Sequence, residues 1–144
     1  DEYDAMTNEE LLAADVDVLV PAATEQVLTE ANAAMVRAKM IVEGANGPTT
    51  AEADAILADN GVVVLPDILA NSGGVIASYV EWHQAKSGAL TSREETFETV
   101  DELVLGAFER VTEFATSKEA TPRVAARALA VQEVIYTMDD RGWI

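Results

Sequence analysis

The 144-residue sequence contains no cysteine, and this absence removes two kinds of chemistry. No disulfide framework can form, and no thiolate can act as a nucleophile or bind a metal ion. Histidine is almost as scarce, because His83 is the only one and cannot build a histidine cluster. The acidic residues do not have the spacing of a calcium-binding loop either. The sequence therefore predicts no metal centre, and the lack of cysteine fits a cytoplasmic setting.

Basic residues are few, since nine lysines and arginines stand against 26 aspartates and glutamates, for a formal net charge of −17. A protein with this charge repels nucleic-acid phosphates and anionic lipid surfaces, so neither is expected as a partner. The acidic residues are spread along the chain rather than gathered in one tail. Because concentrated salt screens such self-repulsion, the sequence predicts a halophilic source.

The chain also lacks any run of about 18 apolar residues, so no segment is expected to span a membrane. Hydrophobic residues nevertheless make up 49% of the sequence, enough for a folded core in a chain of this length. The first residue is Asp1 rather than methionine, and no basic and apolar leader follows it. We therefore expect one domain or part of one, taken from a longer chain.

Three short apolar segments, each ending at a turn sequence, predict the strands of a sheet: residues 16–20, 39–43 and 62–66. Helices between them, joined by short loops, favour parallel pairing with right-handed crossovers. The pattern is typical of an α/β fold, namely half of a Rossmann-like doubly wound sheet that binds nucleotides. Ligands of such sheets bind beyond the carboxyl ends of the strands. The strand exits are therefore expected to line one edge, in residues 22–23, 44–48 and 67–74.

Local signals predict the helices of this first part of the chain. A capping-box spacing at Thr7 predicts one helix, and residues 25–30 are expected to form a short second one. Another capping-box spacing, at Thr49, opens a helix that ends near residue 59 at an Asn-Gly pair. Residues 67–70 are expected to be a short connection.

Beyond His83 the sequence predicts helices alone. A capping-box spacing at Ser92 opens a long helix, and Thr121 with Pro122 opens a last one. Each helix carries an apolar stripe that is interpreted as core packing: Phe97, Val100, Val104, Ala107, Val111 and Phe114 on the first, and Val124, Ala128, Val131, Ile135 and Met138 on the second.

Two glycines, Gly73 and Gly74, open the helix that follows the third strand. Glycines remove side chains where a backbone must approach a ligand or another element closely. The free N–H groups of a first helical turn also favour an anionic or carbonyl-bearing ligand. Asn71, Ser72 and, two turns further in, Ser78 add polar groups there. The alternative is that Asn71 or Ser72 only caps the helix and that the glycines only allow packing.

Four separated motifs occur in order along the chain. They are PAATEQ at residues 21–26, EGANGPTT at 43–50, VVVLPD at 62–67 and NSGGVIASYVEW at 71–82. Together they resemble the C-terminal part of the glutamate dehydrogenases, densely from about residue 15 to residue 83 and weakly through the later helices. The resemblance implies an enzyme that oxidises L-glutamate to 2-oxoglutarate and ammonium and passes hydride to NAD or NADP.

The resemblance also implies site residues. In the family, the asparagine matching Asn71 and the backbone near Ala23 and Asn46 approach the nicotinamide and its ribose, and the residues matching Val75 and Ser78 shape the pocket for the glutamate side chain. An amide and a hydroxyl can orient a carboxylate and a carboxamide, while an apolar side chain fixes position by contact. The alternatives are that the serine hydroxyl bonds back to its own helix and that Asn46 only forms a turn.

Other parts of the family's site have no match in this sequence. The glycine-rich dinucleotide fingerprint is missing, and the catalytic lysine and aspartate belong to an N-terminal region without a counterpart here, so no catalytic residue is assigned. We expect residues 1–118 to be the C-terminal half of the dinucleotide-binding domain with a connecting helix. Residues 119–144 are expected to return to a substrate domain supplied by the rest of the same enzyme chain. The family suggests a homo-hexamer.

Two other functions stay open. A leucine, valine or phenylalanine dehydrogenase shares the asparagine and the paired glycines, although residues 43–48 and Glu81 with Trp82 fit the glutamate branch better. A self-standing nucleotide-binding module without catalysis would instead fold alone and bind a dinucleotide. The choice between NAD and NADP is open, because the residues that read the ribose 2′ position follow the missing fingerprint.

Overall fold

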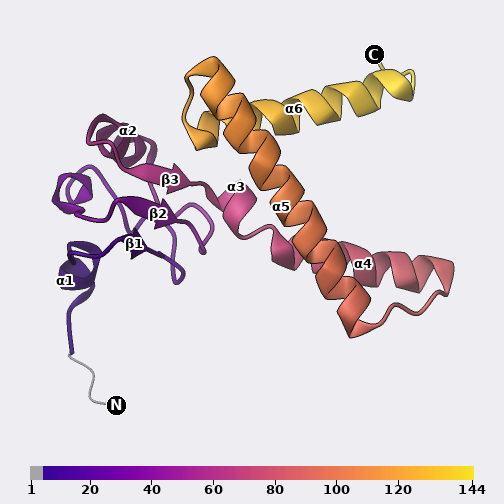
Figure 1. Ribbon diagram of the computed structural model, residues 1–144, viewed down its shortest axis with the longest axis horizontal. Coiled ribbons are helices and arrows are strands. Elements are labelled where there is room, and N and C mark those ends of the chain that lie inside the picture. The colour runs from indigo at the N-terminus through magenta and orange to yellow at the C-terminus, as the bar shows by residue number, and fades with distance from the viewer. Residues whose placement is uncertain (1–4) are drawn as a thin grey trace. The chain divides into compact units, whose positions relative to one another are not determined.

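The computed structural model describes residues 5–144, and it divides into two compact units, one ending at Asp67 and the other beginning at Ile68. The first unit holds a parallel sheet and the second holds the long helices (Figure 1). The predicted α/β class with long C-terminal helices is therefore confirmed. No helix within residues 5–144 combines the length and the apolar character needed to cross a membrane.

A three-stranded sheet forms the centre of the first unit. Its strands are β1 (Val18–Leu19), β2 (Met40–Val42) and β3 (Val63–Leu65), in the order β1-β2-β3. Both pairs are parallel, with Ile41 opposite Leu19 on one side and opposite Val64 on the other. The carboxyl ends of the strands therefore meet at one edge, as predicted. Each strand is shorter than the predicted segment, and proline, which has no N–H to donate, follows β1 and β3 closely.

Helix α1 (Asn8–Leu12) begins at the predicted capping box. The Thr7 hydroxyl accepts a hydrogen bond from the N–H of Glu10, and the Glu10 carboxylate accepts one from the N–H of Thr7 at 2.8 Å. The bond from the Thr7 backbone, with a smaller contribution from its hydroxyl, lowers the pKa of the Glu10 carboxyl. Local sequence alone therefore defines this helix start.

Helix α2 (Ala51–Asp59) begins one residue later than the capping-box spacing predicted. Its cap is Thr50, whose hydroxyl accepts from the N–H of Ala53 at 3.3 Å, so the prediction of Thr49 as the cap is wrong. Thr49 instead forms a parallel bridge with Leu28. A residue held in extended pairing with a distant segment cannot also make the first turn of a helix.

The same pairing explains why residues 25–30 do not form the predicted helix. Gln26 has a φ of +52°, which lies outside the right-handed helical region. The N–H of Leu28 donates to the carbonyl of Pro48 at 2.9 Å, and the Leu28 carbonyl accepts from the N–H of Thr50 at 2.9 Å. Backbone groups that a helix would have paired locally are thus satisfied by a segment some twenty residues away.

The core of the first unit surrounds the middle strand. Leu28, Ile41 and Leu57 are fully buried, and they come from the bridge segment, β2 and α2 respectively. The short 3₁₀ helix η1 (Ala33–Met35) contributes Ala33 to the same cluster. The remaining buried members are Leu12, Leu19, Ala38, Ala53 and Val64.

The second unit consists of helices. They are α3 (Asp67–Ala70), which replaces the predicted connection and starts on the last residue of the first unit, α4 (Gly73–Ser87), α5 (Arg93–Lys118) and α6 (Pro122–Asp140). Helices α4 and α6 both pack on α5, with α4 near its beginning and α6 near its end (Figure 1). The long helix α5 is therefore the element that joins the others.

The predicted starts of α5 and α6 are confirmed. Ser92 and Glu95 form a reciprocal capping box, and the hydrogen bond from the Ser92 backbone N–H, with a smaller one from its hydroxyl, lowers the pKa of the Glu95 carboxyl. The Thr121 hydroxyl accepts from the N–H of Val124 at 3.3 Å, and Pro122 occupies the first turn.

Helix α6 is apolar on two opposite faces, and only one of them is covered by residues 5–144. Ala125 and Ala126 are buried in a cluster with residues of α3 and α5. The other face, here called the outer face of α6, consists of Val124, Ala128, Val131 and Ile135, which are all exposed. The interpretation of this stripe as core packing is therefore wrong within residues 5–144.

Candidate functional site

The first two strand exits are joined by main-chain hydrogen bonds at the carboxyl edge of the sheet. The carbonyl of Pro21, after β1, accepts from the N–H of Gly44 at 3.1 Å and from the N–H of Ala45 at 2.9 Å, both after β2. Two donors from one loop on a single acceptor hold the exits close together. The first and second exits are thus connected to each other at this edge.

Gly44 makes this close approach possible. A Cβ atom on Gly44 would lie 2.9 Å from the Cβ of Ala22, a distance that real Cβ contacts essentially never show. A side chain at this position would therefore push the two exits apart. The close approach at Gly44, which was not predicted from the sequence, is made against Ala22 of the first exit.

Two carboxylates join the second exit to the third. The Glu43 carboxylate, which is fully buried, accepts a hydrogen bond from the N–H of Asp67 at 2.8 Å. The Asp67 carboxylate in turn accepts from the N–H of Gly47 at 2.8 Å. Each exit therefore donates a backbone N–H to a carboxylate of the other exit, and these hydrogen bonds are of the strong, charge-assisted kind.

Two of the predicted cofactor residues lie on this edge. Ala23 lies in the first exit and Asn46 in the second, and both residues are exposed. Both neighbours of Asn46 are held by the hydrogen bonds above, and Ala23 lies two residues after the Pro21 carbonyl that accepts two of them. The first unit therefore presents an exposed backbone segment and an exposed carboxamide on a fixed support, an arrangement suited to orienting a polar ligand.

The other three predicted site residues belong to the second unit. Asn71 precedes α4, while Val75 and Ser78 lie three positions apart within it and so share one face of the helix. Val75 is 68% exposed, and Ser78 is exposed as well. Helix α4 thus presents an apolar group and a hydroxyl side by side on an open surface.

The Ser78 hydroxyl does not bond back to its own helix, which was the alternative to ligand contact. Within residues 5–144 it makes no hydrogen bond. Other hydroxyls do bond back, since Ser87 donates to the carbonyl of His83 at 2.8 Å and Thr96 donates to that of Ser92 at 3.0 Å. The Ser78 hydroxyl therefore has its full hydrogen-bonding capacity available.

Ser72 does not cap α4, contrary to the alternative weighed for this helix start. Its φ of −65° is helical, and its hydroxyl donates backwards to the carbonyl of Leu69 at 2.7 Å. Gly73 does allow packing, because a Cβ there would lie 3.3 Å from Cγ1 of Val100 on α5. No atom lies within 4 Å of a Cβ built on Gly74, so packing does not require the second glycine.

Sequence reasoning missed the roles of Glu43 and Asp67. A signal was present, because each acidic residue directly follows an apolar strand or the proline that ends one. Such a residue must be exposed or bonded to neighbouring backbone, and only the tertiary structure distinguishes these outcomes. A search of the described residues, 5–144, finds no group of three histidine, aspartate or glutamate side chains that could hold a metal ion.

Comparison with known proteins identifies the family. The family model described as glutamate/leucine/phenylalanine/valine dehydrogenase matches residues 1–142. The chain belongs to this family. The resemblance inferred from the four motifs is therefore confirmed over almost the whole sequence.

Three relatives illustrate the similarity. An NADP-specific glutamate dehydrogenase of Saccharolobus shibatae is 51% identical, covering 95% of this chain and 33% of that protein. A cryptic catabolic NAD-specific glutamate dehydrogenase of Bacillus subtilis is 43% identical, covering 98% of this chain and 33% of that protein. The crystal structure of a hetero-hexameric glutamate dehydrogenase of Thermus thermophilus, in a leucine-bound form, matches with a TM-score of 0.87 at 34% identity, over 94% of this chain and 33% of that one. This member of the dehydrogenase family thus spans about one third of the length of these relatives.

The contact between Gly44 and Ala22 generates a prediction about stability. Replacing Gly44 with alanine should lower the free energy of unfolding of this chain by about 1–3 kcal/mol, because the added methyl group overpacks the joined exits. Urea unfolding followed by far-ultraviolet circular dichroism measures the change.

The matched control for this substitution is Gly106→Ala in α5, where no atom lies within 4 Å of the added Cβ. It should stabilise the chain by about 0.5–1 kcal/mol, since alanine loses less backbone entropy than glycine in a helix. Equal effects of the two substitutions would contradict the close approach described for Gly44.

Proposed function

We propose that this chain forms the cofactor-binding side of an NAD(P)-dependent glutamate dehydrogenase, which oxidises L-glutamate to 2-oxoglutarate and ammonium. The observation that supports the proposal is the carboxyl edge of the sheet, where hydrogen bonds join the three strand exits and where Ala23 and Asn46 lie exposed. Ligands of parallel α/β sheets bind at this edge. The named activity is supported by the glutamate dehydrogenases to which the chain is 51% and 43% identical.

On this proposal Ala23, Asn46 and Asn71 contact the nicotinamide end of the cofactor. The backbone near Ala23 and Asn46 and the carboxamide of Asn71 can donate to and accept from an amide and ribose hydroxyls. The cofactor is NAD or NADP, and similar relatives of both specificities are known, namely the NADP-specific enzyme of Saccharolobus shibatae and the NAD-specific enzyme of Bacillus subtilis.

Val75 and Ser78 are proposed to bind the substrate. An exposed valine one turn from an uncommitted hydroxyl matches the two parts of the glutamate side chain, which has methylene groups followed by a carboxylate. The valine would contact the methylene groups, and the serine would donate a hydrogen bond to the carboxylate. Such contacts hold the α-carbon in a fixed position for hydride transfer.

The reaction needs groups that this chain does not supply. The family's catalytic lysine and aspartate match no residue here, so the proposal assigns no catalytic residue to this chain. On this proposal they are supplied by the rest of the enzyme chain, since this chain spans 33% of each of these relatives. Residues 1–118 would then complete a dinucleotide-binding domain, and residues 119–144 would return to the substrate domain.

The outer face of α6 supports this return. Val124, Val131 and Ile135 are 56%, 59% and 48% exposed, although the opposite face of the helix is already packed. A contiguous exposed apolar surface of this kind marks an interface. We assign the outer face to the substrate domain of the full-length enzyme.

The full-length protein is proposed to assemble as a homo-hexamer. Light scattering, which measures the mass of the assembly, gives the number of subunits. The relative from Thermus thermophilus is a hetero-hexamer, which supports the number of subunits. A cytoplasmic setting is proposed on the absence of cysteine, because disulfide bonds are characteristic of oxidising compartments.

The role of Ser78 can be measured by steady-state kinetics of the full-length enzyme. The wild type should reduce NAD or NADP with glutamate in preference to leucine. Ser78→Ala should lower kcat/KM for glutamate roughly tenfold to hundredfold, because a hydrogen bond to a charged group contributes about 1.5–3 kcal/mol.

Ser87→Ala is the matched control, since it removes a hydroxyl from the same helix that already bonds to His83. Its kcat/KM should stay close to that of the wild type. A preference for leucine would favour the branched-chain dehydrogenase alternative, and dinucleotide binding without turnover of either substrate would favour a non-catalytic module.

The assignment of the outer face of α6 predicts different effects of one substitution in two settings. In the full-length enzyme Val131→Glu should lower the thermal midpoint strongly, because it buries a charge without a partner. In the 144-residue chain alone the same substitution should change the free energy of unfolding by less than about 0.5 kcal/mol, because the position is exposed. Gln132→Glu adds the same side chain at a polar position and should be neutral in both. A neutral Val131→Glu in the full-length enzyme would refute the assignment.

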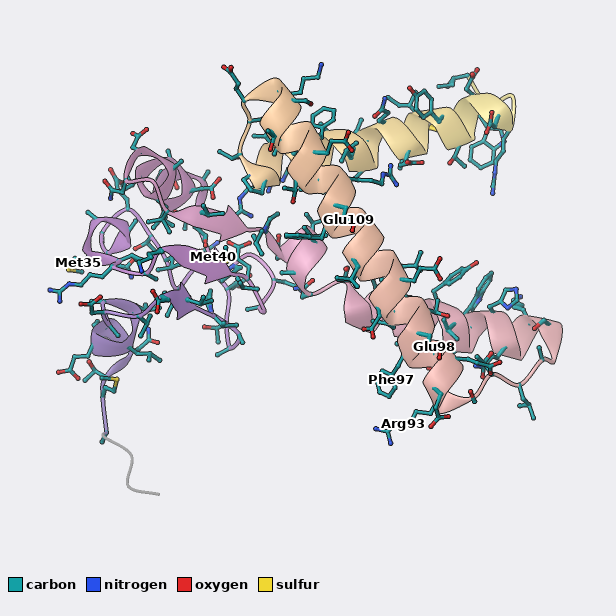
Figure 2. The ribbon with its side chains drawn as sticks, viewed as in Figure 1. Met35, Met40, Arg93, Phe97, Glu98 and Glu109 are labelled. Carbon is teal, nitrogen blue, oxygen red and sulfur yellow. The ribbon has the colours of Figure 1, made fainter. Side chains whose placement is uncertain are left out.

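We also propose a halophilic source from the formal net charge of −17, and this proposal predicts that salt stabilises the protein. Exposed carboxylates such as Glu98 and Glu109 project from α5 (Figure 2), and their mutual repulsion weakens when salt screens it. The free energy of unfolding should therefore rise from low to molar potassium chloride. Changing Glu98, Glu109 and Glu113 together to glutamine should reduce that rise. Equal stability at both salt concentrations would count against a halophilic source.

A further inference from the structure

Glu43 is a charged residue in a place where water cannot reach it. It follows the last residue of β2 directly and has no exposed surface. A buried carboxylate is costly unless hydrogen bonds within the protein replace its hydration. The position therefore demands donors from the surrounding chain, and the identity of those donors indicates what the carboxylate does.

One donor comes from the exit of the neighbouring strand. Oε2 of Glu43 accepts from the backbone N–H of Asp67 at 2.8 Å, while the N–H of Glu43 itself donates to the carbonyl of Leu65 at 3.1 Å. The residue thus contacts the end of β3 through both its backbone and its side chain. This double attachment continues the β2–β3 pairing past the end of the sheet.

The attachment reaches the loop that carries Asn46. Glu43 holds the backbone N–H of Asp67, and the side-chain carboxylate of Asp67 accepts from the N–H of Gly47 at 2.8 Å. On the other side of Asn46, the N–H of Ala45 donates to the carbonyl of Pro21 at 2.9 Å. Both neighbours of Asn46 are therefore fixed, one to the first exit and one, through Asp67 and Glu43, to the third.

We propose that Glu43 is a positioning residue for the nicotinamide cofactor, which acts by holding Asp67 and thereby the loop of residues 44–47. The proposal rests on the proposed function, in which Asn46 contacts the cofactor. Loss of the carboxylate would release the N–H of Asp67, and the Gly47 side of the loop would lose its anchor. Because ligand affinity depends on fixed geometry, cofactor binding should weaken even where the protein stays folded.

The test uses the full-length enzyme with two substitutions at Glu43. Glu43→Leu removes the acceptor, and the Kd of the reduced dinucleotide, measured by fluorescence titration, should rise roughly tenfold or more. Glu43→Gln keeps one acceptor oxygen for the N–H of Asp67 and should recover most of the affinity. Because the change is in the cofactor loop, the KM for the cofactor should rise more than the KM for glutamate.

The matched control is Leu57→Ala. Leu57 is fully buried in the core of the same unit, near the end of α2 that precedes β3, and so lies away from the strand exits. The substitution should lower stability while leaving the Kd of the folded enzyme unchanged. If Glu43→Leu acted only by destabilising the fold, it would behave like this control, and the proposal would be overturned.

Hydrogen exchange provides a measurement that does not depend on the cofactor. Peptides that contain residues 44–47 should exchange faster in Glu43→Leu than in Glu43→Gln or in the wild type. If the wild type binds the cofactor, the inference would be overturned by either of two results for Glu43→Leu: unchanged protection of this loop, or an unchanged Kd for the dinucleotide. A wild type that binds neither dinucleotide would overturn the proposed function, and the inference with it.

Discussion

The hydrogen bond between the buried Glu43 carboxylate and the N–H of Asp67 is the interaction on which the carboxyl edge of the sheet depends. A carboxylate removed from water must be satisfied inside the protein, and each donor that satisfies it becomes fixed in turn. Here the fixed donor carries a second carboxylate, which holds the loop after β2. With the two bonds to the Pro21 carbonyl, the three exits become one support. Ligand-binding residues on loops need such support, because loops are otherwise the most mobile parts of a fold.

The second unit follows a different principle, since the side chains proposed to bind substrate and one apolar face lie on open helix surfaces. Val75 and Ser78 are exposed on α4, and α6 carries an uncovered apolar face opposite its packed one. Both features are expected of a chain that spans about one third of its relatives' length. The formal net charge of −17 adds repulsion among carboxylates, which opposes compaction and weakens as the salt concentration rises.

The accuracy of the sequence predictions depended on how local the governing interactions are. The capping boxes at Thr7 and Ser92 involve residues three positions apart, and both were predicted correctly. The parallel sheet was also predicted, from three short apolar runs separated by helix signals, although Val18 and Val63 within it are exposed. Residues 25–30 were predicted wrongly as helix, since Leu28 pairs with a segment some twenty residues further along the chain. That pairing also moved the cap of α2 from Thr49 to Thr50.

The sequence by itself determined the family, the positions of the three strands and of the long C-terminal helices, and the residues expected to contact cofactor and substrate, because motifs and short-range periodicity carry this information. The tertiary structure decided which groups support the site. Glu43 and Asp67 read in the sequence as ordinary acidic residues, and their roles depend on the parallel pairing that brings two strand exits together. It also decided that the outer face of α6 stays uncovered, because a helix with two apolar faces can be buried on both only when a second partner is present.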